Sequence, residues 1–150
     1  MERKRKIIPP VYLFFTLAFM WLLQRYYPVV QFIEEPLAYA GVIPVLFGIM
    51  MSAISAGMFV KTQTGLEPFE EATTLVTGGF YRITRNPMYL GMFMMLFGVA
   101  FLLGSISALL PMLLFALIIR NNFVLGEERF LEAAFGQSYL DYKSEVRRWI

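Results

Sequence analysis

The sequence predicts an all-α integral membrane protein with about four transmembrane helices, followed by C-terminal interfacial helices. The first observation behind this prediction is composition. Of the 150 residues, 58% are hydrophobic, more than a soluble domain of this size can bury in one core. The second is charge placement, because the charges gather at the N-terminus, around residues 61–86 and after Arg120. We therefore expect a single membrane domain over residues 1–150.

Four apolar runs predict the transmembrane helices, at about residues 10–27, 37–60, 88–103 and 106–125. The second run is the clearest, because it contains no charge. A helix of that length, about 36 Å, exceeds a hydrocarbon core of roughly 30 Å. The segments 61–87 and 126–150 then form a loop and a tail. Apolar residues gather on one helical side of the tail, which predicts helices half-buried in headgroups or against the bundle.

Local signals support the individual helices. Basic residues precede the first run as in a signal peptide, but no small-x-small cleavage site follows, so we expect a retained anchor. Pro87 suits the first turn of the third helix, where its missing N–H needs no partner. The Gly104-Ser105 turn makes the third and fourth helices an antiparallel hairpin. Small residues that allow close helix packing recur along the second helix, namely Gly41, Gly48, Ser52, Ser55, Ala56 and Gly57.

The basic residues predict the orientation. With four spans, both termini lie on one side of the membrane, and twelve of the thirteen Lys and Arg residues fall on that side. Only Arg25 falls opposite. Because cytoplasmic segments carry an excess of Lys and Arg, we predict that both termini face the cytoplasm. The twelve residues are Arg3, Lys4, Arg5, Lys6, Lys61, Arg82, Arg85, Arg120, Arg129, Lys143, Arg147 and Arg148.

The absence of cysteine and histidine narrows the chemistry. It excludes disulfides, thiolate nucleophiles, Cys/His zinc sites and His-based triads, so we expect no metal site. The formal net charge of +2 is too small to indicate nucleic-acid binding, and the basic residues flank the apolar runs without forming a stripe. Any chemistry must use carboxylates, Arg, Lys, Tyr, amides or the backbone.

Two polar groups of residues interrupt the apolar runs. Leu75 to Gly91 gathers two arginines, two tyrosines, three glycines and a proline, and Arg120 to Glu128 closes the fourth run. The start of the third helix and the end of the fourth meet at one face of an antiparallel hairpin, so we expect these groups to be neighbours. Each has an ordinary interpretation, as an anchor, a helix start or a snorkelling side chain. Together, ionisable groups at membrane depth indicate a functional site.

The two groups also resemble a known family. Val76-Thr77-Gly78-Gly79-Phe80-Tyr81-Arg82-x-x-Arg85-Asn86-Pro87-Met88-Tyr89-Leu90-Gly91 is followed by Glu127-Glu128 and then by Phe135-Gly136-x-x-Tyr139-x-x-Tyr142. In order and spacing these motifs are similar to those of the isoprenylcysteine carboxyl methyltransferase family and its prokaryotic and phospholipid-methylating relatives. The resemblance covers about residues 60–150.

This resemblance implies a membrane enzyme that transfers the methyl group of S-adenosylmethionine to a lipid-bearing or lipophilic acceptor. Two positions depart from the family pattern. Asn86 stands where the eukaryotic enzymes have His, and Phe123 stands where they place a substrate-binding Arg, which weakens the case for a prenylcysteine carboxylate. Carried onto this chain, the cofactor-binding positions are Leu75, Val76, Tyr81, Asn86, Pro87, Met88, Tyr89 and Glu127.

The residue types suit methyl transfer, because carboxylates and tyrosine rings can hold a sulfonium cation. A carboxylate acceptor needs no general base, and Arg85 or Arg120 can orient it by a bidentate contact. An amine acceptor must lose a proton, for which Glu128 is the candidate. We favour carboxyl O-methylation over phospholipid amine N-methylation, with catalytic roles for these three residues.

Two other protein classes compete with a methyltransferase. A non-catalytic membrane bundle explains four helices, but it does not explain why arginines, tyrosines and the Glu127-Glu128 pair gather at one face. A nicotinamide-dependent membrane reductase is disfavoured, because no Gly-x-Gly-x-x-Gly follows a strand. The sequence does not indicate an oligomeric state.

Overall fold

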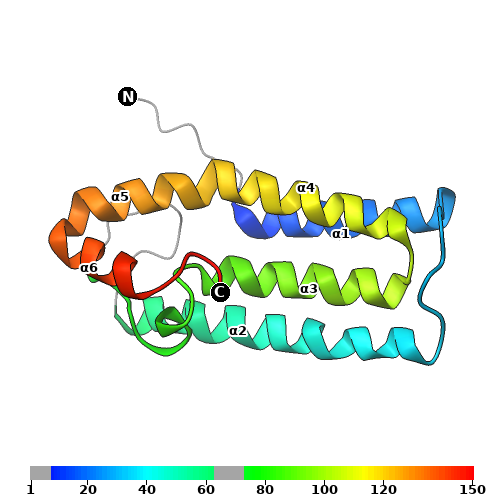
Figure 1. Ribbon diagram of the computed structural model, residues 1–150, viewed down its shortest axis with the longest axis horizontal. Coiled ribbons are helices and arrows are strands. Elements are labelled where there is room, and N and C mark those ends of the chain that lie inside the picture. Colours follow the sequence, from blue (N-terminus) through cyan, green and yellow to red (C-terminus); the bar gives the residue numbers. More distant parts are fainter. Residues whose placement is uncertain (1–7, 63–72) are drawn as a thin grey trace.

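In the computed structural model, residues 8–62 and 73–150 are described, and they form helices without a named strand (Figure 1). The predicted all-α class is therefore confirmed. The elements, in chain order, are α1 (Pro9–Tyr26), η1 (Leu37–Gly41), α2 (Val42–Lys61), η2 (Gly79–Arg82), α3 (Pro87–Leu103), η3 (Ile106–Ala108), α4 (Leu109–Ile119), η4 (Arg120–Val124), α5 (Leu125–Phe135) and α6 (Gln137–Glu145).

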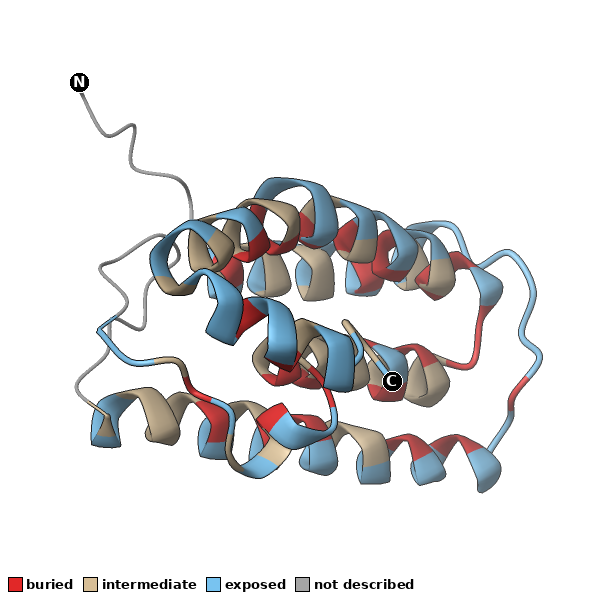
Figure 2. Cartoon of the chain, turned by 60° about the vertical axis from the view of Figure 1, so that its left-hand side comes forward, coloured by how far each residue is buried: buried red, intermediate tan, exposed pale blue. Residues whose placement is uncertain are grey.

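The apolar surface is that of a membrane protein. Within the described residues, two helical stretches are long and apolar enough to cross a membrane, Leu37–Lys61 and Ile106–Phe135. The helix Pro87–Leu103 is apolar but shorter. Buried positions face the interior while the outward sides are exposed (Figure 2). Large hydrophobic side chains on these outward sides, such as Phe14 on α1 and Ile43 on α2, are more than 60% exposed, as expected of a lipid-facing surface.

Glycines allow α2 and α3 to pack closely and antiparallel. A Cβ atom built on Gly41 would collide with the carbonyl oxygen of Gly98, and one built on Gly48 would collide with that of Gly91. The reverse additions collide in the same way. The two glycine pairs are seven residues apart on each side, and they allow the backbones of η1–α2 and α3 to touch. The small residues along the second apolar run predict this close packing.

The α3–α4 hairpin closes at what we term the turn end, formed by Gln24, Gln31, Gly104, Ser105 and Ser107. Gly104 adopts a positive φ of 65° and its carbonyl accepts hydrogen bonds from the backbone N–H groups of residues 32 and 33 (2.9 and 3.2 Å). The Gln31 amide donates to the carbonyl of residue 103 (2.9 Å). Ser105 Oγ donates to Gln24 Oε1 and lies 2.6 Å from Ser107 Oγ. Neutral hydrogen bonds therefore tie α1, the following loop and the hairpin together.

The helix that starts at Ile106 does not end near residue 125, so this predicted boundary is wrong. It continues to Phe135 through a π-helical turn, η4. Ile119 is followed by two adjacent buried positions in this turn, Phe123 and Val124, and then by Glu128 after it. The extra residue lets both halves keep a face toward the bundle, while the polar residues 120–122 lie exposed on the other side.

The tail folds back over the bundle. Gly136 has a positive φ of 54° and ends α5, after which α6 returns toward α3 (Figure 1). The buried face of α6 and the residues beyond it consists of Tyr139, Tyr142 and Val146, which pack with Leu75 and with residues of α5. The apolar side of the tail thus packs against the protein and covers the loop before α3. Its amphipathic pattern predicts burial either in headgroups or against the bundle, and the contacts correspond to the second.

Candidate active site

The two polar groups predicted to be neighbours meet where α3 begins and α5 follows the π turn. Tyr89, in the first turn of α3, donates a hydrogen bond from its hydroxyl to Glu127 Oε1 at 2.6 Å. Pro87 starts α3, and its fixed φ and missing N–H suit this position. The predicted proximity is thus confirmed by a direct contact between residues 38 positions apart.

Aromatic rings support this pair. Tyr89 is only 6% exposed, and its ring centroid lies 6.4 Å from that of Phe123. Phe123 in turn meets Tyr12 of α1 edge-on at 5.7 Å. The departure from the family pattern at position 123 therefore places an apolar ring beside Tyr89. Fixing the phenol in this way aims its hydroxyl at the carboxylate.

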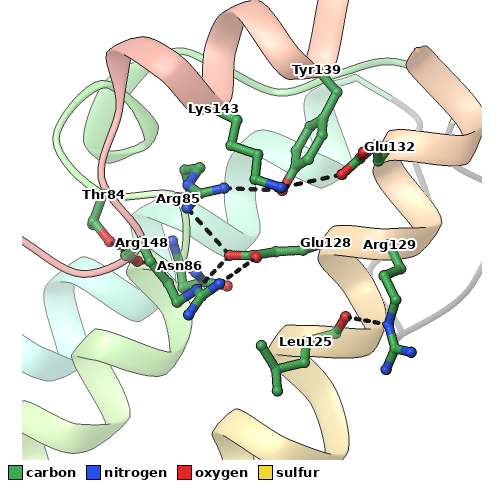
Figure 3. A network of polar contacts seen from close by, with 10 residues as sticks. All are labelled: Thr84, Arg85, Asn86, Leu125, Glu128, Arg129, Glu132, Tyr139, Lys143 and Arg148. Atoms are coloured by element: carbon green, nitrogen blue, oxygen red, sulfur yellow. Dashed lines mark hydrogen bonds and ion pairs between the residues drawn. The ribbon is translucent and has the colours of Figure 1, made fainter.

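The second carboxylate has different partners. Glu128 accepts two hydrogen bonds from Arg148, Nε to Oε1 and Nη2 to Oε2, both at 2.8 Å (Figure 3). Arg85 Nη2 lies 3.5 Å from Glu128 Oε1, and Arg85 Nη1 donates to Tyr139 Oη at 3.5 Å. The bond to Glu128 raises the pKa of Arg148 above its usual range, so this guanidinium stays charged. The adjacent glutamates thus have different partners. Glu127 binds a neutral phenol, whereas Glu128 binds two guanidinium cations.

The residues before α3 hold the tail through the carbonyls of Arg147 and Arg148. The backbone N–H of Arg85 donates to the carbonyl of Arg147 at 2.9 Å. Thr84 Oγ1 and Asn86 Nδ2 both donate to the carbonyl of Arg148 at 3.0 Å (Figure 3). Asn86, a predicted cofactor-binding residue, therefore uses its side-chain amide to bind the tail.

The loop that precedes α3 contributes another buried phenol. Tyr81 is 5% exposed, lies 5.7 Å from the ring of Phe59, and accepts a hydrogen bond at its carbonyl from Tyr142 Oη at 2.7 Å. Burial raises the pKa of the Tyr81 and Tyr142 hydroxyls, so both stay protonated. Val76 is buried nearby in sequence, and Leu75 packs against α6. Residues 63–72 of the predicted loop lie outside the described residues.

Arg120 is not brought into this cluster. It lies in the π turn with an exposed side chain, and its Nη1 donates to Asn121 Oδ1 at 3.0 Å. Met88 stands at the edge of the predicted site, where its carbonyl accepts a hydrogen bond from Ser52 Oγ of α2 at 3.1 Å. Tyr89 and Glu127, and Arg85 with Glu128, therefore come into contact as predicted neighbours, whereas Arg120 is directed to the outside of the bundle.

Two apolar cavities lie on either side of Tyr89. The larger, about 520 Å³, lies between α2 and α3 beside the start of α1, and its lining includes Met88 and Ser52. The smaller, about 240 Å³, lies between α3 and α4, and Trp149 also lines it. Tyr89 lines both. Space for apolar groups therefore adjoins Tyr89, the phenol that is hydrogen-bonded to Glu127.

The donor set suits a cationic ligand with an apolar neighbour. A buried carboxylate beside aromatic rings can bind a sulfonium or ammonium group by charge and by cation–π contact. Residues outside the sequence-based assignment also take part, because Arg148 holds Glu128 and Trp149 lines the smaller cavity. No spacing in the sequence marks these two, since their partners lie on other elements.

Comparisons with known proteins show the family to which the chain belongs. A family model described as phospholipid methyltransferase matches residues 37–138. A protein of Haemophilus influenzae, described as uncharacterized, is 38% identical over 63 residues, which is 42% of this chain and all of that protein. The protein-S-isoprenylcysteine O-methyltransferase of Schizosaccharomyces pombe is 37% identical over 75 residues, which is 48% of this chain and 30% of that enzyme.

The fold also has a solved counterpart. The eukaryotic intramembrane Ras methyltransferase, an isoprenylcysteine carboxyl methyltransferase, aligns with a TM-score of 0.64 at 18% identity. The alignment covers 97% of this chain and 52% of that chain. Since the family model matches more than half of the chain, and since the resemblance seen in the motifs is confirmed, the chain belongs to the phospholipid methyltransferase family, whose members, like the isoprenylcysteine carboxyl methyltransferases, use S-adenosylmethionine as methyl donor.

Proposed function

We propose that this protein transfers the methyl group of S-adenosylmethionine to a lipid-like or prenylated acceptor at the cytoplasmic face of a membrane, and that the acceptor atom is a carboxylate oxygen. The observation that carries the proposal is the Tyr89–Glu127 hydrogen bond, a polar pair between two apolar cavities. Such a pair offers a place for a charged reacting group, while the cavities offer space for the apolar part of an acceptor.

The cofactor residues are assigned by the family motif and supported by their positions. Glu127 and the rings of Tyr81 and Tyr89 would hold the positive charge, with the remaining positions at Leu75, Val76, Asn86, Pro87 and Met88. When bound, S-adenosylmethionine supplies an electrophilic methyl group. The contribution of the protein is then mainly positioning and exclusion of water, for which buried, mutually packed side chains are suited.

The surroundings of Arg85 and Glu128 favour a carboxylate acceptor over an amine. Glu128 is engaged by two guanidinium groups, which disfavours its use as a base for an amine. Arg85 Nε is buried without a hydrogen-bond partner among the described residues, so it has a donor available for an acceptor carboxylate. We assign Arg85 to orientation of the acceptor and the exposed Arg120 to its recruitment.

The proposal places four helices across the membrane with both termini in the cytoplasm, as the distribution of Lys and Arg indicates. The sequence has no cysteine, so single cysteines can be introduced without background. Cysteines at Arg147 and at Tyr27 should react with a membrane-impermeant maleimide from opposite sides of sealed vesicles. Labelling of both from the same side would contradict the topology.

Binding of S-adenosylhomocysteine to purified protein tests the cofactor assignment. We expect a calorimetric signal and a thermal shift that Glu127→Gln and Tyr89→Phe both weaken, whereas Arg120→Ala lowers turnover more than affinity. Absence of binding at millimolar ligand would contradict a methyltransferase. Equal affinity in all three variants would show that the site is misplaced.

The acceptor can be found by incubating the protein with labelled S-adenosylmethionine and a total lipid extract, followed by mass spectrometry. A methyl ester in the labelled product supports the proposed carboxyl transfer. A methylated phospholipid amine would support the alternative that the family name suggests, an N-methyltransferase.

A further inference from the structure

The segment 146–149, which we term the C-terminal strap, crosses from the loop before α3 to α5. Val146 is 9% exposed and belongs to the cluster formed with Tyr139 and Tyr142. The carbonyls of the next two residues accept three hydrogen bonds from residues 84–86. The strap is therefore fixed along its backbone to the same loop that carries the predicted cofactor residues.

A second attachment runs through a side chain. Arg148 makes a bidentate contact with Glu128 at 2.8 Å, and Arg85 lies 3.5 Å from the same carboxylate (Figure 3). Bidentate guanidinium–carboxylate pairs hold both direction and distance. Since Arg148 is fixed at its carbonyl and at its guanidinium, the position of the following residue, Trp149, is determined by this pair.

Trp149 then forms part of the wall of the smaller cavity. Its indole packs against the main core and lines the space of about 240 Å³ with residues of α3 and α4, including Phe93, Phe115 and Ile119. Apart from Tyr89 and Trp149, the lining is aliphatic or Phe side chains. The volume is below the roughly 300–1,000 Å³ of a complete small-molecule site, so the cavity suits the end of an apolar chain.

We infer that Trp149 is a specificity-determining residue, which limits the length of the hydrocarbon chain that the acceptor can place beside Tyr89, and that Arg148 is the positioning residue that holds it there. This inference rests on the proposed function, because it concerns the acceptor of the same site. The occupant is the linear or branched apolar chain of a carboxylic acid. Its carboxylate lies toward Arg85, and its chain end reaches the indole.

The first test measures binding without methyl transfer. The chain has two tryptophans, so Trp21→Phe leaves Trp149 as the only tryptophan, whose emission is excited selectively over that of tyrosine. Trp21 is 59% exposed on α1 and serves as the matched control when Trp149→Phe is made in its place. We expect ω-brominated fatty acids of increasing chain length to quench Trp149 saturably, with quenching that unbrominated acid reverses. Trp21 should show only the linear quenching of a lipid-facing side chain.

The outcomes separate the inference from the proposed function. Saturable quenching of Trp149 that Arg148→Ala abolishes and Arg148→Lys partly restores supports the inference whether or not methyl transfer is found. Quenching that is linear for both tryptophans overturns it, even if the protein is an active methyltransferase. Thermal melting of each variant shows whether a loss of quenching reflects a loss of folding.

The second test uses methyl transfer to N-acetylcysteines that carry geranyl, farnesyl or geranylgeranyl chains. Trp149→Ala should raise the ratio of kcat/KM for the longest over the shortest chain by about tenfold, as expected when a pocket wall is removed. Trp149→Phe should give an intermediate ratio, and affinity for S-adenosylhomocysteine should not change. An unchanged chain-length profile in Trp149→Ala would overturn the inference and leave the proposed function intact.

Discussion

The two ends of the bundle are held by different chemistry. At the turn end, Gln24, Gln31 and Ser105 connect three segments by neutral hydrogen bonds around a glycine turn. At the opposite end, Arg85, Glu128 and Arg148 form a partly buried ionic cluster beside the Tyr89–Glu127 pair. Neutral bonds are sufficient to close a helical hairpin. A buried ionic cluster is costly to desolvate, so its presence at one end indicates that this end does more than close the fold.

The largest effect is expected from removing the charge at the centre of the ionic cluster. Glu128→Gln leaves Arg85 and Arg148 close together without a counter-charge, and the Arg85 side chain is only 9% exposed. We expect a loss of stability of about 3 kcal/mol, at the low end for broken buried pairs because Arg148 is partly exposed. Thermal unfolding in detergent measures it. The matched control is Glu132→Gln, whose pair with Lys143 is exposed and should contribute under about 1 kcal/mol.

Replacement of the neighbouring residue, Glu127, should affect cofactor binding much more than stability. Glu127→Gln keeps a group that can accept the Tyr89 hydrogen bond but loses the charge, so the melting temperature should change little. Affinity for S-adenosylhomocysteine should fall about 10- to 100-fold, the range for a lost charge-assisted hydrogen bond. Calorimetry on both glutamate variants checks this. If the two variants lose stability and affinity to the same extent, the distinction between the carboxylates fails.

A third prediction concerns the glycine contacts between α2 and α3, which lie along the bundle between its two ends. In Gly91→Ala the added methyl group meets Ser52 Oγ and the carbonyl of Gly48, so α2 and α3 must separate. We expect destabilisation of about 1–3 kcal/mol, the usual cost of overpacking. Gly57→Ala is the control, because no atom lies within 4 Å of its added Cβ, and it should be neutral or stabilising by up to about 1 kcal/mol. Equal melting temperatures for the two variants would contradict the close packing.

The smallest effect is expected at the turn end. Ser105→Ala removes hydrogen bonds to Gln24 and Ser107, both between neutral groups. The loss should be about 1 kcal/mol. Affinity for S-adenosylhomocysteine should be unchanged, because the turn end lies at the other end of α3 from Tyr89. A marked loss of affinity would show that the two ends are coupled and that the comparison is too simple.

The sequence predicts the helices where hydrophobic pattern alone decides. The apolar runs at 37–60 and 88–103 correspond closely to η1 with α2 and to α3, and the hairpin rule brings Tyr89 to Glu127. The predicted end near residue 125 is wrong for a physical reason. The polar residues after Ile119 read as the end of a span, but a π turn places them on the exposed side and the helix continues.

The ionic cluster is the part that the sequence does not predict. Arg148 pairs with Glu128 across 20 residues and a chain reversal, and no helical or strand periodicity links the two positions. Asn86 is named by the motif, but its amide is used to bind the carbonyl of Arg148. Such contacts depend on how the tail docks, which is a tertiary property. Fixed-spacing motifs identify the residues near the site, while the partners of those residues come from the fold.

The π turn at Arg120–Val124 also affects which residues of this helix share a face. A π turn contains one residue more than an α-helical turn, so equal residue counts on either side of it do not indicate equal helical faces. Phe123 lies four residues before Glu127. It is itself part of this turn, and its ring is buried beside Tyr89. Residues before and after the turn are therefore offset from the faces that a continuous α-helix would give them. The face of a residue in this part of the chain is counted from Glu127 on one side and from Ile119 on the other.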